Sequence, residues 1–278
     1  MATLKKKEGI LPKTLKPDYE YDLIRIGKNN DGGYLVSENS IMDSEILVSA
    51  GIALDVSFEH QYINLTKNNV KCFDHTINLK EYTFLWLVIL LKRIVTFTSL
   101  FEIKNAIKRL DKAIKFKKFI KDKKVNYYKI GLGVGNNNTT TLDNTGLGSW
   151  QKYTMTLDTI ISKFTENKKI FCKIDIEGHE YRLLDDLIHH SNKISGLVIE
   201  FHDVDLHLDK IINFKKKIDL TLVHTHINNA GPIVEKKPSI IELSFGKNPK
   251  NVGDLKNTKH LLDQPNLIEL EDIELKFE

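Results

Sequence analysis

The stretch that decides the fold reads Lys173-Ile174-Asp175-Ile176-Glu177-Gly178-His179-Glu180. It continues the apolar run Ile170–Ile174, which is typical of a buried strand, and a helical spacing of leucines follows it. A strand that opens through a turn into a helix is typical of an open parallel sheet, in which ligands bind outside the carboxyl ends of the strands. The positive end of the expected helix explains Glu177 and Glu180 as stabilising charges. It does not explain Asp175, which still belongs to the strand.

Short β-branched apolar runs alternate with helical patterns along most of the chain. This alternation predicts βαβ units, and therefore an α/β fold with a doubly wound, mostly parallel sheet. Amphipathic helices are expected near residues 157–164, 183–188 and 208–212. Seven strands are expected, at Ile46–Ala50, Val70–Phe73, Val125–Ile130, Ile170–Ile174, Gly196–Phe201, Leu220–Thr225 and Ile240–Phe245.

The length of 278 residues suits one large domain over residues 1–278. We divide it into an N-terminal segment (1–44), a helical insertion after the second strand (78–124) and a C-terminal extension (246–278), whose acidic tail beyond Gln264 we expect to be peripheral. The insertion contains the apolar run Phe84–Leu91, which is too short to span a membrane because a spanning helix needs roughly 20 apolar residues. We therefore predict a buried or interfacial helix and no membrane span. The position of the insertion would allow it to act as a lid or acceptor platform.

The composition, with 41% hydrophobic and 28% charged residues, is that of an ordinary globular protein. Cys72 and Cys172 lie in apolar runs, so we expect buried free thiols, which suit a reducing compartment. Residues 1–16 are basic but lack the apolar core of a signal peptide. These features together predict a cytoplasmic protein.

The segment between Lys104 and Lys124 carries ten Lys and Arg residues against two acids. It could form a surface for an anionic substrate, a nucleic acid or a membrane face, or it could be a solvated helix face. We favour the solvated face. Nucleic acid is an unlikely partner because only Phe116 and Phe119 accompany the lysines as stacking aromatics.

Three strand ends carry residues suited to binding a nucleotide-like ligand. Gly51 and Ala53, in the turn after the first strand, would let a ligand approach the backbone. Asp74, at the end of the second strand, could accept hydrogen bonds from both hydroxyls of a ribose, or it could cap the next helix. The complete set of cofactor-binding candidates is Ser49, Gly51, Ala53, Glu59, Asp74, His75, Gly131, Leu132, Gly133 and Asp175.

Four polar residues follow the fourth, fifth and sixth strands: Asp175, Glu200, His202 and His226. If these strands are neighbours, the four side chains meet at one edge of the sheet, because residues two apart on a strand share a face. The group could perform acid–base chemistry, with His202 or His226 as the base and Glu200 orienting it. It could also bind a divalent metal. Spacing does not choose between these uses, and we adopt the acid–base interpretation without a metal.

In these motifs the sequence resembles the FkbM-type methyltransferases, a branch of the class I S-adenosylmethionine-dependent enzymes. The stretch from Lys173 to Glu180 is similar to the lysine–aspartate–glutamate–glycine motif of that family. The supporting matches, in order, are Asp31–Tyr34, Asp55–Glu59, Phe73-Asp74, Thr156–Asp158, Ile199–Asp203 and His224–Asn229. Together they extend from about residue 20 to 245 and omit most of the insertion.

The resemblance implies a seven-stranded Rossmann-like sheet whose last strand is antiparallel, with S-adenosylmethionine as the methyl donor. It also implies an oxygen acceptor on a small molecule, a sugar or a surface glycan. This acceptor could be anionic, because the segment Lys104–Lys124 is basic. Methylation of nucleic acid or of a small metabolite through the 104–124 helix is the alternative. A nicotinamide dehydrogenase should show a fuller Gly-x-Gly-x-x-Gly turn. A non-catalytic binding module would not need the convergent Asp, Glu and His residues.

Overall fold

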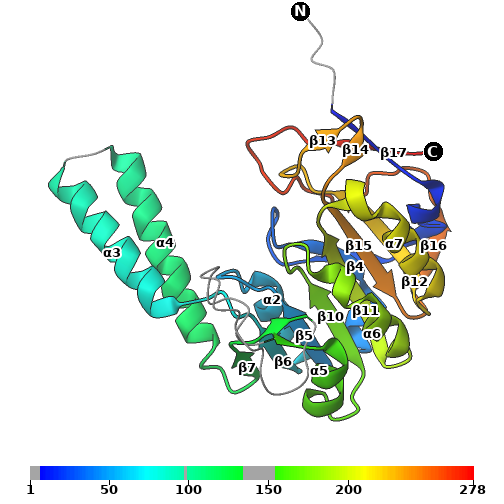
Figure 1. Cartoon of the computed structure of the whole chain (residues 1–278), viewed down its shortest axis with the longest axis horizontal. Coiled ribbons are helices and arrows are strands. Elements are labelled where there is room, and N and C mark those ends of the chain that lie inside the picture. Colours follow the sequence, from blue (N-terminus) through cyan, green and yellow to red (C-terminus); the bar gives the residue numbers. More distant parts are fainter. Residues whose placement is uncertain (1–6, 97–98, 134–153) are drawn as a thin grey trace, which may run out of the picture.

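A seven-stranded sheet forms the centre of the computed structural model, which describes residues 7–96, 99–133 and 154–278 (Figure 1). Its strand order is β12-β15-β11-β10-β5-β6-β7. All seven predicted strands are present, and the sheet is mostly parallel as predicted. β15 runs antiparallel to both of its neighbours, as the resemblance implies. The strands are β5 (Ile46–Ala50), β6 (Asn69–Phe73), β7 (Val125–Tyr128), β10 (Ile170–Ile174), β11 (Ile194–Phe201), β12 (Thr221–Ile227) and β15 (Ile241–Gly246).

Helices cover both faces of the sheet, so its central strands are mostly apolar. Every residue of β5, β10 and β11 is buried. One core cluster packs α5 (Leu157–Phe164), α6 (Leu184–His189) and α7 (Val204–Lys217) against one face. A second cluster contains Ile41 of α1 (Glu38–Met42), Phe58 and Tyr62 of α2 (Ser57–Thr66), and Phe116. Cys72 and Cys172 are buried free thiols in these cores, as predicted.

The N-terminal and C-terminal segments pair with each other around the sheet. β1 (Glu8–Leu11) runs parallel to β17 (Glu274–Phe277), and β2 (Tyr19–Tyr21) pairs with β16 (Asn251–Asp254). β3 (Leu23–Ile26) pairs with β4 (Tyr34–Ser37), which directly follows Asp31-Gly32-Gly33. The remaining short elements are η1 (Lys13–Leu15), β8 (Gly131–Leu132), β9 (Thr154–Met155), η3 (Glu180–Arg182), β13 (Ile233–Val234) and β14 (Lys237–Pro238).

Two long helices, α3 (Leu79–Val95) and α4 (Leu100–Phe119), connect β6 to β7. They pack against each other as a hairpin that projects away from the sheet, in cyan and green in Figure 1. The end of α4 is attached to the body through Phe116, whose ring meets Tyr127 of β7 edge-on at 5.4 Å. Residues 97–98, which belong to the predicted insertion, lie outside the described residues. Among the helices that the structure describes, none is long and apolar enough to cross a membrane.

Candidate functional site

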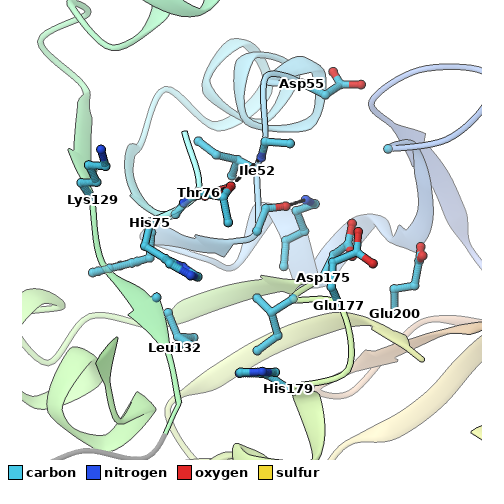
Figure 2. Close-up of a pocket in the computed structure, with 18 of the residues that line it drawn as sticks. Ile52, Asp55, His75, Thr76, Lys129, Leu132, Asp175, Glu177, His179 and Glu200 are labelled. Carbon is cyan, nitrogen blue, oxygen red and sulfur yellow. Dashed lines mark hydrogen bonds between the residues drawn. The ribbon is translucent and has the colours of Figure 1, made fainter. Parts of the chain in front are cut away.

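A cavity of about 1130 Å³ opens at the carboxyl ends of β5, β6, β10 and β11. Figure 2 shows the carboxylates of Asp175, Glu177 and Glu200 on one side of it and His75, Lys129 and Leu132 on the other. Seven of the ten predicted cofactor-binding residues line this cavity: Gly51, Ala53, Asp74, His75, Gly131, Leu132 and Asp175. The location agrees with the general position of ligands in open α/β sheets.

Gly51 must be glycine because of the neighbouring chain. Its φ is +72°, and a Cβ added there would overlap the carbonyl oxygen of Asp175. We predicted that Gly51 allows a ligand to approach the backbone. In the structure its missing side chain makes room for the Asp175 backbone, which also donates from its amide nitrogen to the Ala50 carbonyl oxygen at 3.1 Å. The turn after β5 and the motif after β10 are therefore in direct contact.

Asp74 holds the turn after β5 in place. Its Oδ2 accepts a hydrogen bond from the Ala53 amide at 2.8 Å, and Ala53 has a positive φ of 43°. Its Oδ1 accepts from both the amide and the hydroxyl of Thr76, at 2.7 and 2.6 Å. A carboxylate oxygen has room for a further donor, so Asp74 can both shape the turn and face a ligand in the cavity.

His75 presents an unsatisfied nitrogen in the cavity wall. Among the described side chains, its Nε2 is buried without a hydrogen-bond partner. The ring lies against Gly131, where a Cβ would come within 2.7 Å of Nδ1. Burial lowers the pKa of His75, which favours the neutral ring. A ligand atom in the cavity would satisfy this nitrogen, as buried polar groups generally require.

Three predicted cofactor-binding residues do not line the cavity. Ser49 and Glu59 are buried behind it, where the Ser49 hydroxyl donates to Glu59 Oε1 at 2.5 Å. The Gly133 amide donates to the Met155 carbonyl in the short β8–β9 pair. Each of the three has a protein partner in this structure, and their contact with a ligand stays a prediction.

Two buried carboxylates, Asp175 and Glu200, converge at the acidic end of the cavity. The Tyr34 hydroxyl lies 3.3 Å from Asp175 Oδ2 and 3.5 Å from Glu200 Oε2. The Asn228 side-chain amide donates to Glu200 Oε1 at 3.1 Å. Tyr34 comes from β4 and Asn228 from the end of β12, so four segments of the chain assemble this pair.

The carboxylate pair sits beside a buried lysine. Burial raises the pKa of Asp175 to about 6, against the opposing effect of the Lys173 ammonium. Burial also raises the pKa of Glu200, and the neighbouring Asp175 carboxylate raises it further. Burial alone would lower the pKa of Lys173, but the carboxylates around it, first among them Glu59, outweigh burial and raise it. At neutral pH the site therefore combines a lysine cation, an ionised Asp175 and a Glu200 that holds a proton readily.

His202 lies behind this pair and is held by Glu180. Its Nδ1 is 3.2 Å from Glu180 Oε1, and its Nε2 is 3.5 Å from Glu200 Oε1. Glu180 is fully buried and also accepts from the amides of Ile176 and Gly178, at 2.9 and 3.0 Å. Burial alone would lower the pKa of His202, but the bond to Glu180 and the nearby carboxylates raise it. A raised pKa favours the protonated ring and reduces the share of neutral imidazole that could accept a proton, so the geometry favours His202 as a partner of the carboxylates over His202 as the base.

The prediction that His226 joins this group is wrong. β15 lies between β11 and β12, so Glu242 stands between Glu200 and His226 in the register. His226 instead lines a second, smaller cavity closed by the C-terminal extension, with Nδ1 3.5 Å from Glu242 and Nε2 3.7 Å from Asp272. Burial opposes its charge, but Asp272 and Glu242 raise its pKa to about 10. It is therefore protonated at neutral pH and cannot accept a proton there.

The C-terminal tail beyond Gln264 is not peripheral, contrary to our expectation. Asn266 is buried and donates to Glu242 Oε1 at 2.6 Å, and Asn229 donates to the Leu267 carbonyl at 3.0 Å. The extension thus covers the ends of β12 and β15.

Several cavity residues were not among the predicted site residues. Lys173 had a recognisable signal, since a lysine inside a run of buried apolar residues needs a charged partner. Asn228, which contacts Glu200 but does not itself line the cavity, lies one residue beyond β12 in the matched stretch His224–Asn229, where we had assigned it no role. The others that line the cavity include Asp31, Asp55, Thr76, Lys129, Glu177 and His179.

The acidic end of the cavity also contains residues that could bind a metal ion. Asp175, Glu200 and His202 each offer a ligand atom, and these atoms all lie within 4.8 Å of one another. However, Lys173 already supplies a positive charge to both carboxylates, and His202 is engaged by Glu180. A cation bound to all three residues would have to displace both interactions.

Comparisons with known proteins bear on the family. Among solved structures, the chain is similar to a precorrin-6y C5,15-methyltransferase from Geobacter metallireducens GS-15, with 9% identity, coverage of 75% of this chain and 83% of that chain, and a TM-score of 0.36. It is also similar to a protein from Pyrococcus horikoshii assigned as an RNA methyltransferase, with 11% identity, coverage of 74% and 76%, and a TM-score of 0.36. A search of curated proteins found no match.

The model of the methyltransferase FkbM domain matches residues 148–220. This segment contains the Lys173–Glu180 motif, β10, β11 and the residues Glu200 and His202. The match confirms, over residues 148–220, that the chain is related to the FkbM-type methyltransferases.

Proposed function

We propose that this chain is an S-adenosylmethionine-dependent methyltransferase that methylates a hydroxyl group of a neutral sugar or glycan. The observation that carries the proposal is the convergence of Asp175 and Glu200 on a cavity that is also lined by the turn held by Asp74. The volume also supports it, since a single small ligand usually occupies roughly 300–1,000 Å³ and this cavity is larger. Such a site has room for a donor and part of an acceptor.

The donor side of the cavity fits S-adenosylmethionine. The Gly51–Ala53 turn and Asp74 would hold its adenosine part, and the buried His75 Nε2 would gain the hydrogen-bond partner that it lacks. Leu132 and Phe73 supply apolar surface on the same side. When bound, the cofactor supplies an electrophilic methyl group on a sulfonium.

The acceptor side supplies the base. A hydroxyl must lose its proton as it attacks, and a base is most effective when its pKa lies near the working pH. Asp175 has a pKa of about 6, so it is ionised at neutral pH and can accept that proton. Glu200, held by Tyr34 and Asn228, would bond a second acceptor hydroxyl, and Lys173 and His202 would balance the charge of the pair.

The charge around the cavity favours a neutral acceptor over an anionic one. Asp31, Asp55, Glu81 and Glu177 line it together with the two catalytic carboxylates. An anionic group entering there would meet like charges, whereas sugar hydroxyls are good donors to carboxylates. We therefore replace the anionic acceptor of the sequence analysis with a neutral polyhydroxyl compound. We retain the cytoplasm as the proposed location.

The donor assignment is tested by titration calorimetry with S-adenosylhomocysteine. We expect binding by the unmodified chain and by Asp175→Asn, and weaker binding by Asp74→Asn, because Asp74 shapes the turn. No heat at millimolar ligand with the unmodified chain would sink the donor assignment.

The reaction is tested by methyl uptake from labelled S-adenosylmethionine into a panel of neutral glycans, nucleotide sugars and RNA. Removing a general base typically lowers the rate by about 10²–10⁴-fold, so Asp175→Asn should show this loss while still binding the donor product. Glu269→Gln, which removes an exposed carboxylate that does not line the cavity, is the matched control and should keep full activity. Uptake into RNA alone would overturn the acceptor class.

A further inference from the structure

The helix α3 is unusual because it is apolar all round and yet none of its residues is buried. A helix with this composition normally lies inside a protein or in contact with lipid. By contrast, α5, of similar apolar character, buries four residues in the core. In the described structure only α4 packs along α3, so most of its apolar surface faces outward.

Exposed apolar side chains occur along the α3–α4 hairpin, which projects away from the sheet (Figure 1), and several of the most exposed lie next to its free end. Val95 is 74% exposed, Leu100 75% and Phe101 72%, and Phe84 on α3 is 68% exposed. Others on the two helices are Leu85, Leu87, Val88, Leu91, Ile94, Ile107 and Ile114. A contiguous apolar surface of this kind marks an interaction site.

The net positive charge of the protein also comes from the segment that contains the hairpin. Between residues 79 and 124 there are thirteen Lys and Arg against four Asp and Glu. The remainder of the chain holds 28 Lys and Arg against 33 Asp and Glu, so it is net negative while the hairpin is strongly positive. Exposed lysines flank the apolar end, with Lys92 on α3 and Lys104 and Lys108 on α4.

We propose that the α3–α4 hairpin docks the protein onto an anionic lipid bilayer, with its apolar end in the interface and its lysines on the headgroups. Apolar residues combined with Lys and Arg on a helix that does not span the bilayer are the features of interfacial binding. Each lysine near an anionic surface adds to the attraction. A second copy of this chain is a poorer occupant of the same surface, because two hairpins of like charge would repel each other.

The cavity lies at the base of this hairpin. Asn78, which caps α3, and Glu81, in its first turn, both line the cavity. Docking by the free end would therefore hold the cavity at about the length of α3 from the membrane surface, roughly 25 Å for its 17 residues. The docking itself does not depend on the reaction, because it rests only on the exposed surface of α3 and α4.

The test is co-sedimentation of the full chain with vesicles. We expect binding to phosphatidylcholine vesicles that contain phosphatidylglycerol, little binding to phosphatidylcholine alone, and weakening by salt. Val95→Ser/Leu100→Ser/Phe101→Ser should lower affinity about tenfold or more, because apolar surface drives insertion. Lys104→Glu/Lys108→Glu should lower binding to the anionic vesicles by a similar factor.

Matched controls change the same residue types elsewhere. Leu206→Ser/Leu261→Ser/Ile268→Ser removes equally exposed apolar side chains, and Lys216→Glu/Lys217→Glu reverses two exposed lysines of α7. Both controls should bind vesicles like the unmodified chain, and circular dichroism should show all variants folded. The proposal is overturned if the chain does not sediment with anionic vesicles, or if the controls weaken binding as much as the hairpin variants. It is also overturned if light scattering shows a dimer that only the hairpin variants dissociate.

Discussion

The hydroxyl of Tyr34 lies 3.3 Å from Asp175 Oδ2 and joins two segments 141 positions apart in the sequence. Tyr34 is fully buried, and its ring lies 5.8 Å from the Lys173 ammonium. The N-terminal hairpin β3–β4 thus reaches the candidate site through one side chain. This contact explains why a tyrosine follows the Asp-Gly-Gly turn.

Tyr34→Phe should lower kcat by about tenfold or more, since a hydrogen bond to a charged group contributes roughly 1.5–3 kcal/mol. The hydroxyl favours the ionised form of Asp175, so its loss should also move the acidic limb of the pH–rate profile upward. Initial rates across pH measure both effects. A variant with reduced kcat but an unchanged profile would show that Tyr34 is structural only. Tyr19→Phe, on an exposed tyrosine, serves as the control.

Activity should fall as the pH drops through about 6, because the pKa of Asp175 is about 6 and only its ionised form accepts a proton. Stability should change in the opposite sense. The folded pKa of Asp175 lies above its unfolded value of 3.8, so its contribution is most favourable below 3.8 and is lost as the pH rises through about 6. Asp175→Asn should therefore melt a few degrees higher than the unmodified chain at pH 8 and equally at pH 4. Equal melting temperatures at pH 8 would contradict the raised pKa.

Gly51→Ala should severely destabilise the protein, by about 3 kcal/mol or more, because the new Cβ overlaps the Asp175 carbonyl and φ is positive. Gly253→Ala is the matched control, since Gly253 also has a positive φ but nothing lies within 4 Å of its missing Cβ. Urea unfolding should show a loss of only about 1 kcal/mol for the control. Similar losses at both positions would mean that backbone strain alone, and not the close contact, sets the requirement for glycine.

His226→Gln should leave the rate of methyl transfer within a few-fold of normal, because His226 is outside the catalytic cavity. Its effect should appear in stability. With a folded pKa raised to about 10, His226 contributes stability fully below its unfolded value of about 6.5, and this is lost as the pH rises through 10. Denaturation at several pH values should therefore show a steeper loss between pH 7 and 10 for the unmodified chain than for His226→Gln. Loss of turnover in a folded His226→Gln would restore the histidine to the catalytic group.

The sheet was predictable from the sequence because each central strand is a mostly apolar run buried on both faces. Ile170–Ile174 is the clearest example, since its prediction and its observed bounds are the same. The order of strands is a different matter. Hydrophobic periodicity carries no information about which strands are neighbours, so the position of β15 between β11 and β12 separated His226 from Glu200.

The candidate site was predictable where a residue stands at a strand end. Asp74, Asp175 and Glu200 all face the cavity for this reason. Tyr34 and Asn228 were not identified as site residues, because only the folded chain brings them to the carboxylates. The raised pKa of His202 could not be predicted either. It depends on Glu180, which we had assigned to the start of a helix.

The contact between Gly51 and Asp175 also has a thermodynamic consequence. Gly51 belongs to the turn that would hold the donor, and Asp175 is the residue that would meet the acceptor. The two residues are in direct contact, with no space between them. Any shift of the β10 loop on binding an acceptor must therefore change the donor turn. We expect the two ligands to alter each other's affinity by the same factor, as reciprocity demands, so that the enzyme senses a complete pair of reactants.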